Sequence, residues 1–315
     1  MFVVDSLTKY FGYVAAISGV SFQINEFETT GIFGTSTSGK TTLLDVLSGY
    51  LLKYRGTIRI DGADASSDPA MLRKYISYIP KDGALYTDMN VMDFMNMYCD
   101  LNGIQKRKRR TLIQENLEFA GCQNMTRQNI SNLNKYDRAR ISVAAALTKT
   151  PKILLIDEPY IGLRSNETDA HSKFLKAVAQ KTTLIMASSS IVGFSELCKR
   201  TIILNRGRIV SNTDANLFQN KERKKFIRMK ISSAPDDAKE AFQFVPGIID
   251  LDFSQSSEQG LWDVIINIAD ETSDDIREQV WNAAATAGIP VYEMRMLQVS
   301  PEDLYLQMTG RDTAE

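Results

Sequence analysis

Residues 34–42 read GTSTSGKTT, and their types and spacing are those of a loop that binds phosphate. Gly34, Gly39, Lys40 and Thr41 meet the pattern G-x-x-x-x-G-K-[ST], between an apolar run and a helix-like segment. Such a context points backbone N–H groups and a helix N-terminus at one anion. The lysine would reach the β- and γ-phosphates, and the Thr41 hydroxyl would help hold Mg²⁺. The residues predicted to contact ATP here are Gly34, Ser36, Thr37, Ser38, Gly39, Lys40, Thr41 and Thr42.

Two adjacent acids end a second apolar run, KILLIDEP, at Asp157 and Glu158. Alone, a strand that ends in two acids is commonplace. Together with the glycine-rich loop, the pair fits a nucleotide site in which Asp157 would bind Mg²⁺ through water. Glu158 would then be the candidate catalytic base, placed to take a proton from the attacking water.

These residues require a sheet that brings strand ends together. Up to about residue 215, short β-branched runs alternate with helical patterns, which predicts a mostly parallel sheet covered by helices. The strands are expected at 17–24, 30–33, 56–62, 75–80, 152–157, 182–188 and 201–205, with turns at DG and RGRI. From about 86 to 149 the pattern is helical throughout, which indicates an all-helical insertion.

The basic run KERKKF at 221–226 marks a shift in composition and an expected domain boundary. Beyond it, the predicted order is strand, helix, strand, strand, helix, strand, the βαββαβ order of a ferredoxin-like domain. A last helix is expected at 301–310. The predicted fold is therefore an α/β P-loop NTPase domain at 1–220, with a helical subdomain at about 86–149, followed by a small α+β domain at 221–315.

Composition limits the function classes. The net charge of −1 over 315 residues argues against a dedicated nucleic-acid binder, which would carry a basic excess. The three cysteines form no CxxC, so neither a disulfide framework nor a zinc site is indicated. No apolar run reaches the ~18–20 residues that span a bilayer, and the N-terminal residues lack the features of a signal peptide. A membrane role would act through a partner.

Several other features have simple structural interpretations. His171, the single histidine, is expected on a helix surface, and Trp262 and Trp281 in the core of the small domain. The basic run 105–110 fits the solvated start of a helix, with lipid headgroups or an acidic loop as alternative contacts. The methionine-rich segment 90–99 fits core packing and partner docking equally well.

From residue 1 to about 215, the sequence resembles the ATP-binding subunit of an ABC transporter. LTKYFGYVAAISGVSFQI is similar to the family's opening, where an aromatic residue stacks on adenine, and Phe11 falls there. The residues after 221 resemble, more weakly, a C-terminal extension of some bacterial export ATPases. The resemblance implies head-to-tail dimers, homomeric or heteromeric. In such a dimer each ATP is bound between the phosphate loop of one subunit (residues 34–42, here called the cradle) and the signature loop of the other. The resemblance also implies an integral-membrane permease as partner and a peripheral, cytoplasmic location.

The sequence departs from the family pattern at the positions that support hydrolysis. Lys81 replaces a glutamine, Arg164 an aspartate, Ser189 the switch histidine, and Asn134, Lys135, Tyr136 and Asp137 follow Leu133 in place of the SGGQ of the LSGGQ signature. An ammonium has donors only and offers the metal no oxygen. Lys135 and Tyr136 interpose side chains where glycine lets a backbone approach phosphate. Asp137 favours a helix start but repels a partner's γ-phosphate. Thr37 also replaces a usual glycine, which loosens the cradle without abolishing it.

The sequence therefore predicts an ATP- and Mg²⁺-binding subunit with weak or partner-dependent hydrolysis. One alternative stays open: a non-catalytic regulatory or scaffold subunit for which ATP is a structural ligand. A P-loop enzyme unrelated to transport is disfavoured, because the chain has a helical insertion and lacks a motif for an acceptor substrate.

Overall fold

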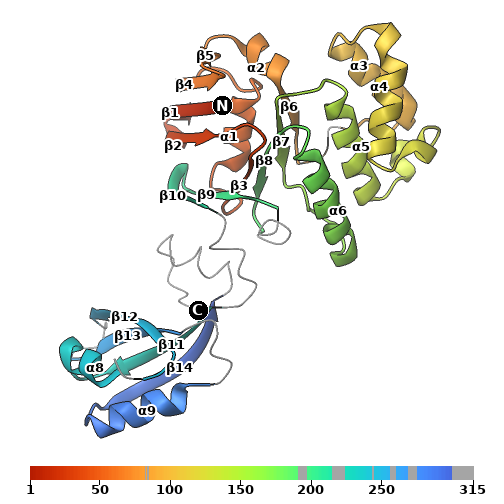
Figure 1. The fold of residues 1–315 in the computed structure, drawn as a ribbon. Coiled ribbons are helices and arrows are strands. Elements are labelled where there is room, and N and C mark those ends of the chain that lie inside the picture. Colours follow the sequence, from red (N-terminus) through yellow and green to blue (C-terminus); the bar gives the residue numbers. More distant parts are fainter. Residues whose placement is uncertain are drawn as a thin grey trace. The chain divides into compact units, whose positions relative to one another are not determined.

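The computed structural model describes residues 1–81, 83, 85–190, 197–214, 224–242, 245–255, 260–268 and 275–299 (Figure 1). The chain divides into two compact units, Met1–Gln219 and Asn220–Glu315. The helix expected at 301–310 lies outside the described residues, as do residues 221–223 of the expected boundary.

The first unit contains a four-stranded antiparallel sheet in the order β2-β1-β4-β5. Its strands are β1 (Phe2–Phe11), β2 (Val14–Ile24), β4 (Arg55–Ile60) and β5 (Ala63–Asp64). The expectation of one mostly parallel sheet was therefore wrong for this part of the chain. Strands that short turns connect pair antiparallel, so β1–β2 and β4–β5 form hairpins. The predicted DG turn joins β4 to β5.

A second sheet of six strands has the order β10-β9-β3-β8-β7-β6, with β10 antiparallel to β9 and the other pairs parallel. The strands are β3 (Thr29–Phe33), β6 (Ile76–Ile79), β7 (Ile153–Asp157), β8 (Thr183–Ser188), β9 (Arg200–Asn205) and β10 (Arg208–Asp214). Because β3, β6, β7 and β8 are parallel, their carboxyl ends meet at one edge. The loops that carry the predicted site residues begin at that edge.

Helices cover both faces of this sheet. Helix α1 (Lys40–Leu47) packs in one core with residues of both sheets, while α5 (Lys135–Leu147) and α6 (Ser165–Val178) contribute to a core with the other face. In β7, the four residues before Asp157 are all apolar because the strand is buried on both faces. Leu155 belongs to the first core and Leu154 to the second, so successive side chains are buried on opposite faces.

The helical subdomain consists of α3 (Val91–Leu101), α4 (Lys106–Phe119), two short 3₁₀ turns (Gln123–Met125 and Ile130–Asn132) and α5. In segment 90–99, Phe94, Met95 and Cys99 are buried, so much of this segment packs in the subdomain core. The basic run begins α4 and is largely exposed. In the part of the chain that the structure describes, no helix has both the length and the apolar composition to cross a bilayer.

The described residues of the second unit form a four-stranded antiparallel sheet in the order β12-β13-β11-β14 with two helices. Its elements are β11 (Lys224–Ile231), α8 (Pro235–Phe242), β12 (Ile248–Gln255), β13 (Trp262–Ile268), α9 (Arg277–Thr286) and β14 (Val291–Val299). Trp262 packs against this unit's own core. Trp281 is 51% exposed, so its expected burial was wrong.

Candidate functional site

The glycine-rich loop connects β3 to α1 and is closely packed against its neighbours. A Cβ added to Gly34 would lie 2.4 Å from the Leu204 carbonyl oxygen, and one added to Gly39 would lie 2.4 Å from the Ala16 carbonyl oxygen. Gly39 also has φ +101°, a conformation that side chains disfavour. A side chain at either position would clash with these carbonyl oxygens, so both positions require glycine. The first turn of α1 leaves backbone N–H groups without intrahelical partners, the arrangement that binds an anion.

Within the loop, Ser38 is buried and its N–H donates to the Thr35 carbonyl at 3.0 Å. Ser36 and Thr37 are exposed, and Thr42 is partly buried at the start of α1. The hydroxyls that stand in this loop therefore lie on its open side, with the exception of Ser38. Gly34 and Gly39, which are packed tightly against neighbouring backbone, therefore determine the course of the loop.

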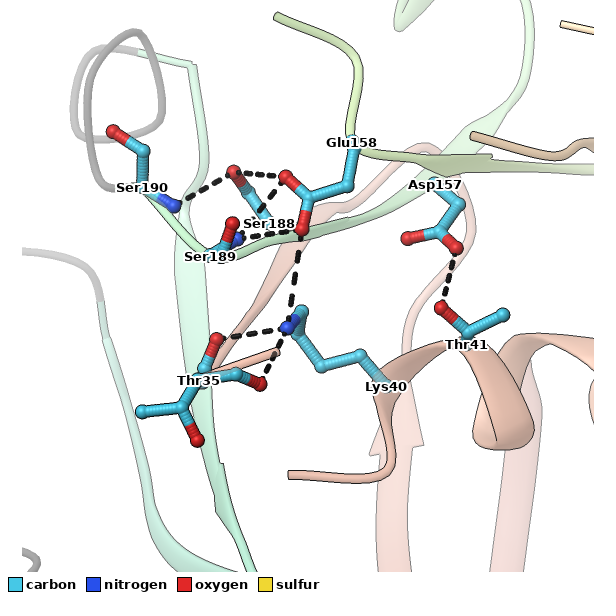
Figure 2. A network of polar contacts seen from close by, with 9 residues as sticks. Thr35, Lys40, Thr41, Asp157, Glu158, Ser188, Ser189 and Ser190 are labelled. Atoms are coloured by element: carbon cyan, nitrogen blue, oxygen red, sulfur yellow. Dashed lines mark hydrogen bonds and ion pairs between the residues drawn. The ribbon is translucent and has the colours of Figure 1, made fainter. Parts of the chain in front are cut away.

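Lys40 is 3% exposed and lies at the centre of the polar network (Figure 2). Its ammonium donates to the carbonyl oxygens of Gly34 and Thr35, each at 2.8 Å, and lies 3.9 Å from a Glu158 carboxylate oxygen. Burial lowers the pKa of Lys40, while the charges of Glu158 and Asp157 oppose that shift. The cation is thus fixed in the cradle by groups of its own chain.

Asp157, at the end of β7, accepts a hydrogen bond from the Thr41 hydroxyl at 2.7 Å. Its other carboxylate oxygen is buried and has no hydrogen-bond partner within the described part of the chain. Burial raises the pKa of Asp157. A carboxylate with one unused oxygen beside a hydroxyl fits Mg²⁺, which proteins commonly bind through one or two carboxylates plus substrate phosphates. Among the described residues, no group of three His, Cys, Asp or Glu is placed to hold a metal ion.

Glu158 has a positive φ of 50°, which costs a residue with a side chain about 1–3 kcal/mol. Its carboxylate accepts from the Ser189 N–H at 2.9 Å and from the Ser188 hydroxyl at 3.2 Å. Figure 2 shows these donors on one side of the carboxylate and Lys40 on the other. Ser189, which the sequence analysis aligned with the switch histidine, thus reaches Glu158 through its backbone N–H.

A cavity of about 310 Å³ adjoins Glu158 and Asp157. Lys81 lines it from the loop after β6, and Lys135 and His171 line it from the helices. Ile79 of β6 stands opposite Ile156 of β7, so the loops that carry Lys81 and Glu158 begin at neighbouring strand ends. The structure therefore places Lys81 in the same cavity as the two acids, and none of residues 34–42 lines that cavity.

The segment that aligns with the signature begins α5. The Asn134 side chain accepts from the Asp137 N–H at 2.8 Å and caps the helix. Asp137 forms an ion pair with Arg140, whose guanidinium lies 4.4 Å from the centre of the Tyr136 ring. Asp137 is thus neutralised and Tyr136 is half-buried, which reduces the repulsion and obstruction expected from these two residues. Lys135 is exposed and lies over Gly162 of the loop after Glu158.

His171 is 1% exposed, so the expectation of a surface residue was wrong. Its ring packs edge-on against Tyr136 and Tyr160, with centroids 5.9 Å and 5.8 Å away. Its Nδ1 is buried without a hydrogen-bond partner among the described residues, and burial lowers the pKa of His171 to about 4. The sequence contained a signal for this burial, because His171 lies three, four and seven residues before the apolar Phe174, Leu175 and Val178, on the same helix face.

Two predicted residues lie outside this network. Arg164 is exposed at the start of α6, where its N–H donates to Glu167 at 2.8 Å. Phe11 ends β1 and is 51% exposed, with the Lys9 ammonium 5.4 Å from its ring centre. It pairs with Val14, two residues before the Ala16 that touches Gly39. An exposed aromatic face on this side of the cradle can stack on a flat base.

Comparisons with known proteins agree with this geometry. Residues 17–161 match the family model described as ABC transporter. The uncharacterised ABC transporter ATP-binding protein YxlF of Bacillus subtilis is 28% identical over 66% of this chain and 69% of its own length. The linearmycin resistance ATP-binding protein LnrL of B. subtilis is 21% identical over 99% of both chains.

Solved structures share the fold. The structure of cbiO1 from Clostridium perfringens, described as part of the ABC transporter complex cbiONQ, has a TM-score of 0.64 with 21% identity. The match covers 78% of this chain and 95% of that one. Residues 17–161 therefore carry the ABC transporter domain, which contains the phosphate loop and the two acids, and the chain is similar to ABC transporter ATP-binding proteins.

Proposed function

We propose that this chain binds Mg·ATP in a complex with a separate integral-membrane permease, and that it hydrolyses ATP slowly or only with help from a partner. The proposal rests on the difference between the residues that would bind phosphate and metal and the residues that would assist attack by water. The groups for phosphate and metal are complete in Lys40, Thr41 and Asp157. The positions that would assist water attack hold Lys81 and Ser189, which offer different chemistry.

For binding, the backbone of residues 36–42 and the Lys40 ammonium would hold the phosphates. Thr41 and Asp157 would hold Mg²⁺, which when bound supplies positive charge that stabilises the phosphates. Phe11 would stack on the base. Lys40 already lies beside two carbonyls that a phosphate oxygen can replace as its partner, because both kinds of group accept hydrogen bonds.

For hydrolysis, Glu158 is the candidate base, and it keeps its place beside the cradle. Its carboxylate accepts hydrogen bonds from residues 188 and 189, which hold it in place, and the attacking water would use one of its remaining acceptor positions. Removing one preorganised stabiliser of the transition state typically lowers a rate by about 10²–10³. Losses within one site do not multiply, so we expect weak rather than absent turnover.

The complex is expected to lie at the cytoplasmic face of a membrane, held there by the permease. A second ATP-binding subunit, identical or different, would complete each nucleotide site. The capped and charge-paired start of α5 supports this part of the proposal, since a preformed and neutralised helix start can approach a partner's phosphate. No nucleic acid is expected as a partner.

The test is a parallel measurement of Mg·ATP affinity and ATP turnover, on the purified chain and on the complex isolated from membranes. We expect millimolar or tighter binding, with turnover at least about tenfold below that of an intact cassette, as the loss of one transition-state stabiliser implies. A Glu158→Gln variant assigns residual turnover to this subunit if the activity disappears. Failure to bind Mg·ATP would refute the proposal.

The runner-up function is a regulatory or scaffold subunit with no turnover of its own. The lysine at position 81 favours it, because an ammonium has donors only and offers a metal or an attacking water no oxygen. The same experiment separates the two functions. Turnover of the complex that Glu158→Gln leaves unchanged supports the scaffold, whereas turnover that this variant removes supports a slow ATPase.

A further inference from the structure

Lys81 places a second ammonium at the edge of the phosphate site. It follows β6 in parallel register with β7 and lines the same cavity as Asp157 and Glu158. The residue is exposed, so its long side chain is free to move toward a phosphate bound on the other side of Asp157 and Glu158, beside Lys40. Its charge already acts at the cradle, since Lys81 is one of the groups that lower the pKa of Lys40.

This lysine changes the charge of the site. Lys40 and Lys81 carry two positive charges, and Asp157 and Glu158 carry two negative ones, so the four together are neutral. With a neutral residue at position 81 the set would carry one net negative charge. A polyphosphate would then need a divalent cation to offset the repulsion by both carboxylates.

The ammonium cannot take the part of a metal ligand, because it has three donors and no acceptor. It can, however, bind a phosphate oxygen directly as a compact point charge. The two residues proposed to hold Mg²⁺ also contact each other, since the Thr41 hydroxyl donates to one oxygen of Asp157 at 2.7 Å. The Lys81 ammonium and a divalent ion could therefore both offset the negative charge of the same phosphate.

We propose that Lys81 binds the γ-phosphate of the bound nucleotide directly and so lets this chain hold ATP with little dependence on Mg²⁺. The inference rests on the proposed function, because it presumes that ATP occupies the cradle. Lys81 would then be a further nucleotide-binding residue, specific for the terminal phosphate, and the chain would bind ATP without a metal.

The test uses the full chain and ATPγS, with affinity measured by calorimetry in Mg²⁺ and in EDTA. We expect wild type to lose less than about tenfold in affinity on metal removal, and Lys81→Gln to lose about tenfold more than that, the worth of one charge-assisted hydrogen bond. In Mg²⁺ the substitution should change affinity by less than about threefold, since the metal then supplies the charge. Lys81→Arg should behave like wild type, because it keeps the charge and the donors.

Lys108→Gln, which removes an exposed lysine of α4 outside the cavity, controls for net charge and should match wild type. ADP lacks the γ-phosphate, so Lys81→Gln should leave its affinity nearly unchanged. Equal effects of Lys81→Gln with and without Mg²⁺, no effect in either, an equal effect on ADP, or the same effect from Lys108→Gln would each overturn the inference. No binding of ATPγS by wild type in Mg²⁺ would instead refute the proposed function.

Discussion

At the scale of single residues, Lys40 is the cation on which capture of a phosphate depends. It is buried, and two carbonyls fix its ammonium at the bottom of the cradle. We expect Lys40→Met, which keeps the length and apolar volume of the side chain, to weaken Mg·ATP binding about 10–100-fold, the worth of a hydrogen bond to a charged group. Calorimetry measures the affinity, and circular dichroism checks the fold. A matched Lys74→Met change on helix α2 (Pro69–Tyr75), where the lysine is exposed, should have no effect. An unaltered affinity in Lys40→Met would contradict this role.

His171 makes the stability of the first unit depend on pH. Its folded pKa of about 4 lies below the ordinary value of 6.5, because burial disfavours the charged ring. The unfolded chain therefore binds the proton first, so stability is full above pH ~6.5 and falls as the pH drops toward ~4. From about pH 7 to about pH 5 this linkage is worth about 2 kcal/mol.

Urea unfolding of wild type and His171→Leu at both pH values checks this expectation. Because His171 is the chain's single histidine, the variant lacks the titrating group while it keeps apolar packing against Tyr136 and Tyr160. The stability of wild type should fall by about 2 kcal/mol more than that of the variant. Equal losses in the two proteins would show that His171 is protonated in the folded state without cost.

At the scale of elements, the turn from β3 into α1 depends on glycine more than any other turn of the site. We expect Gly39→Ala to destabilise the first unit and abolish ATP binding, since its Cβ would lie 2.4 Å from the Ala16 carbonyl oxygen. Gly12, in the turn between β1 and β2, is a matched control with φ +60° and open space around it. Gly12→Ala should cost only about 1–2 kcal/mol, the price of a left-handed conformation. Similar losses in both variants, measured by urea unfolding, would contradict the packing argument.

The elements also show what the sequence could predict. Buried parallel strands such as β7 and β8 were recognised because both faces need apolar side chains, which produces a continuous apolar run. Strand β1 was missed because its alternation is broken at Ser6, which has φ 53°, and its pairing shifts register there. That β2 and β4 belong to a separate sheet depends on distant pairing partners, which local patterns do not contain.

The candidate site divides in the same way. The cradle and the two acids could be predicted because each is a contiguous stretch whose chemistry depends on neighbours in sequence. The contact of His171 with Tyr136 and Tyr160 joins three separate segments, so only its burial, through helical spacing, could have been read. The pairing of Asp137 with Arg140 lies one helical turn apart and could have been predicted from the spacing.

At the scale of the whole molecule, the chain has two units with separate hydrophobic cores. All the residues of the nucleotide site lie in the first unit. The second unit has an apolar core of its own, formed by the sheet β12-β13-β11-β14 with α8 and α9. LnrL matches along nearly the full length of both chains, so the second unit has a counterpart there. We therefore expect the two units to respond differently to nucleotide.

Differential scanning calorimetry of the full chain tests this expectation. A ligand stabilises the unit that binds it, by about 2.7 kcal/mol at ~100 times its Kd, which for a unit of this size raises Tm by roughly 5–10 °C. Saturating Mg·ATPγS should raise one of two transitions and leave the other in place, and Lys40→Met should remove the shift. If both transitions moved together, the units would unfold cooperatively, and the second unit would then have to be counted among the elements that stabilise the nucleotide site.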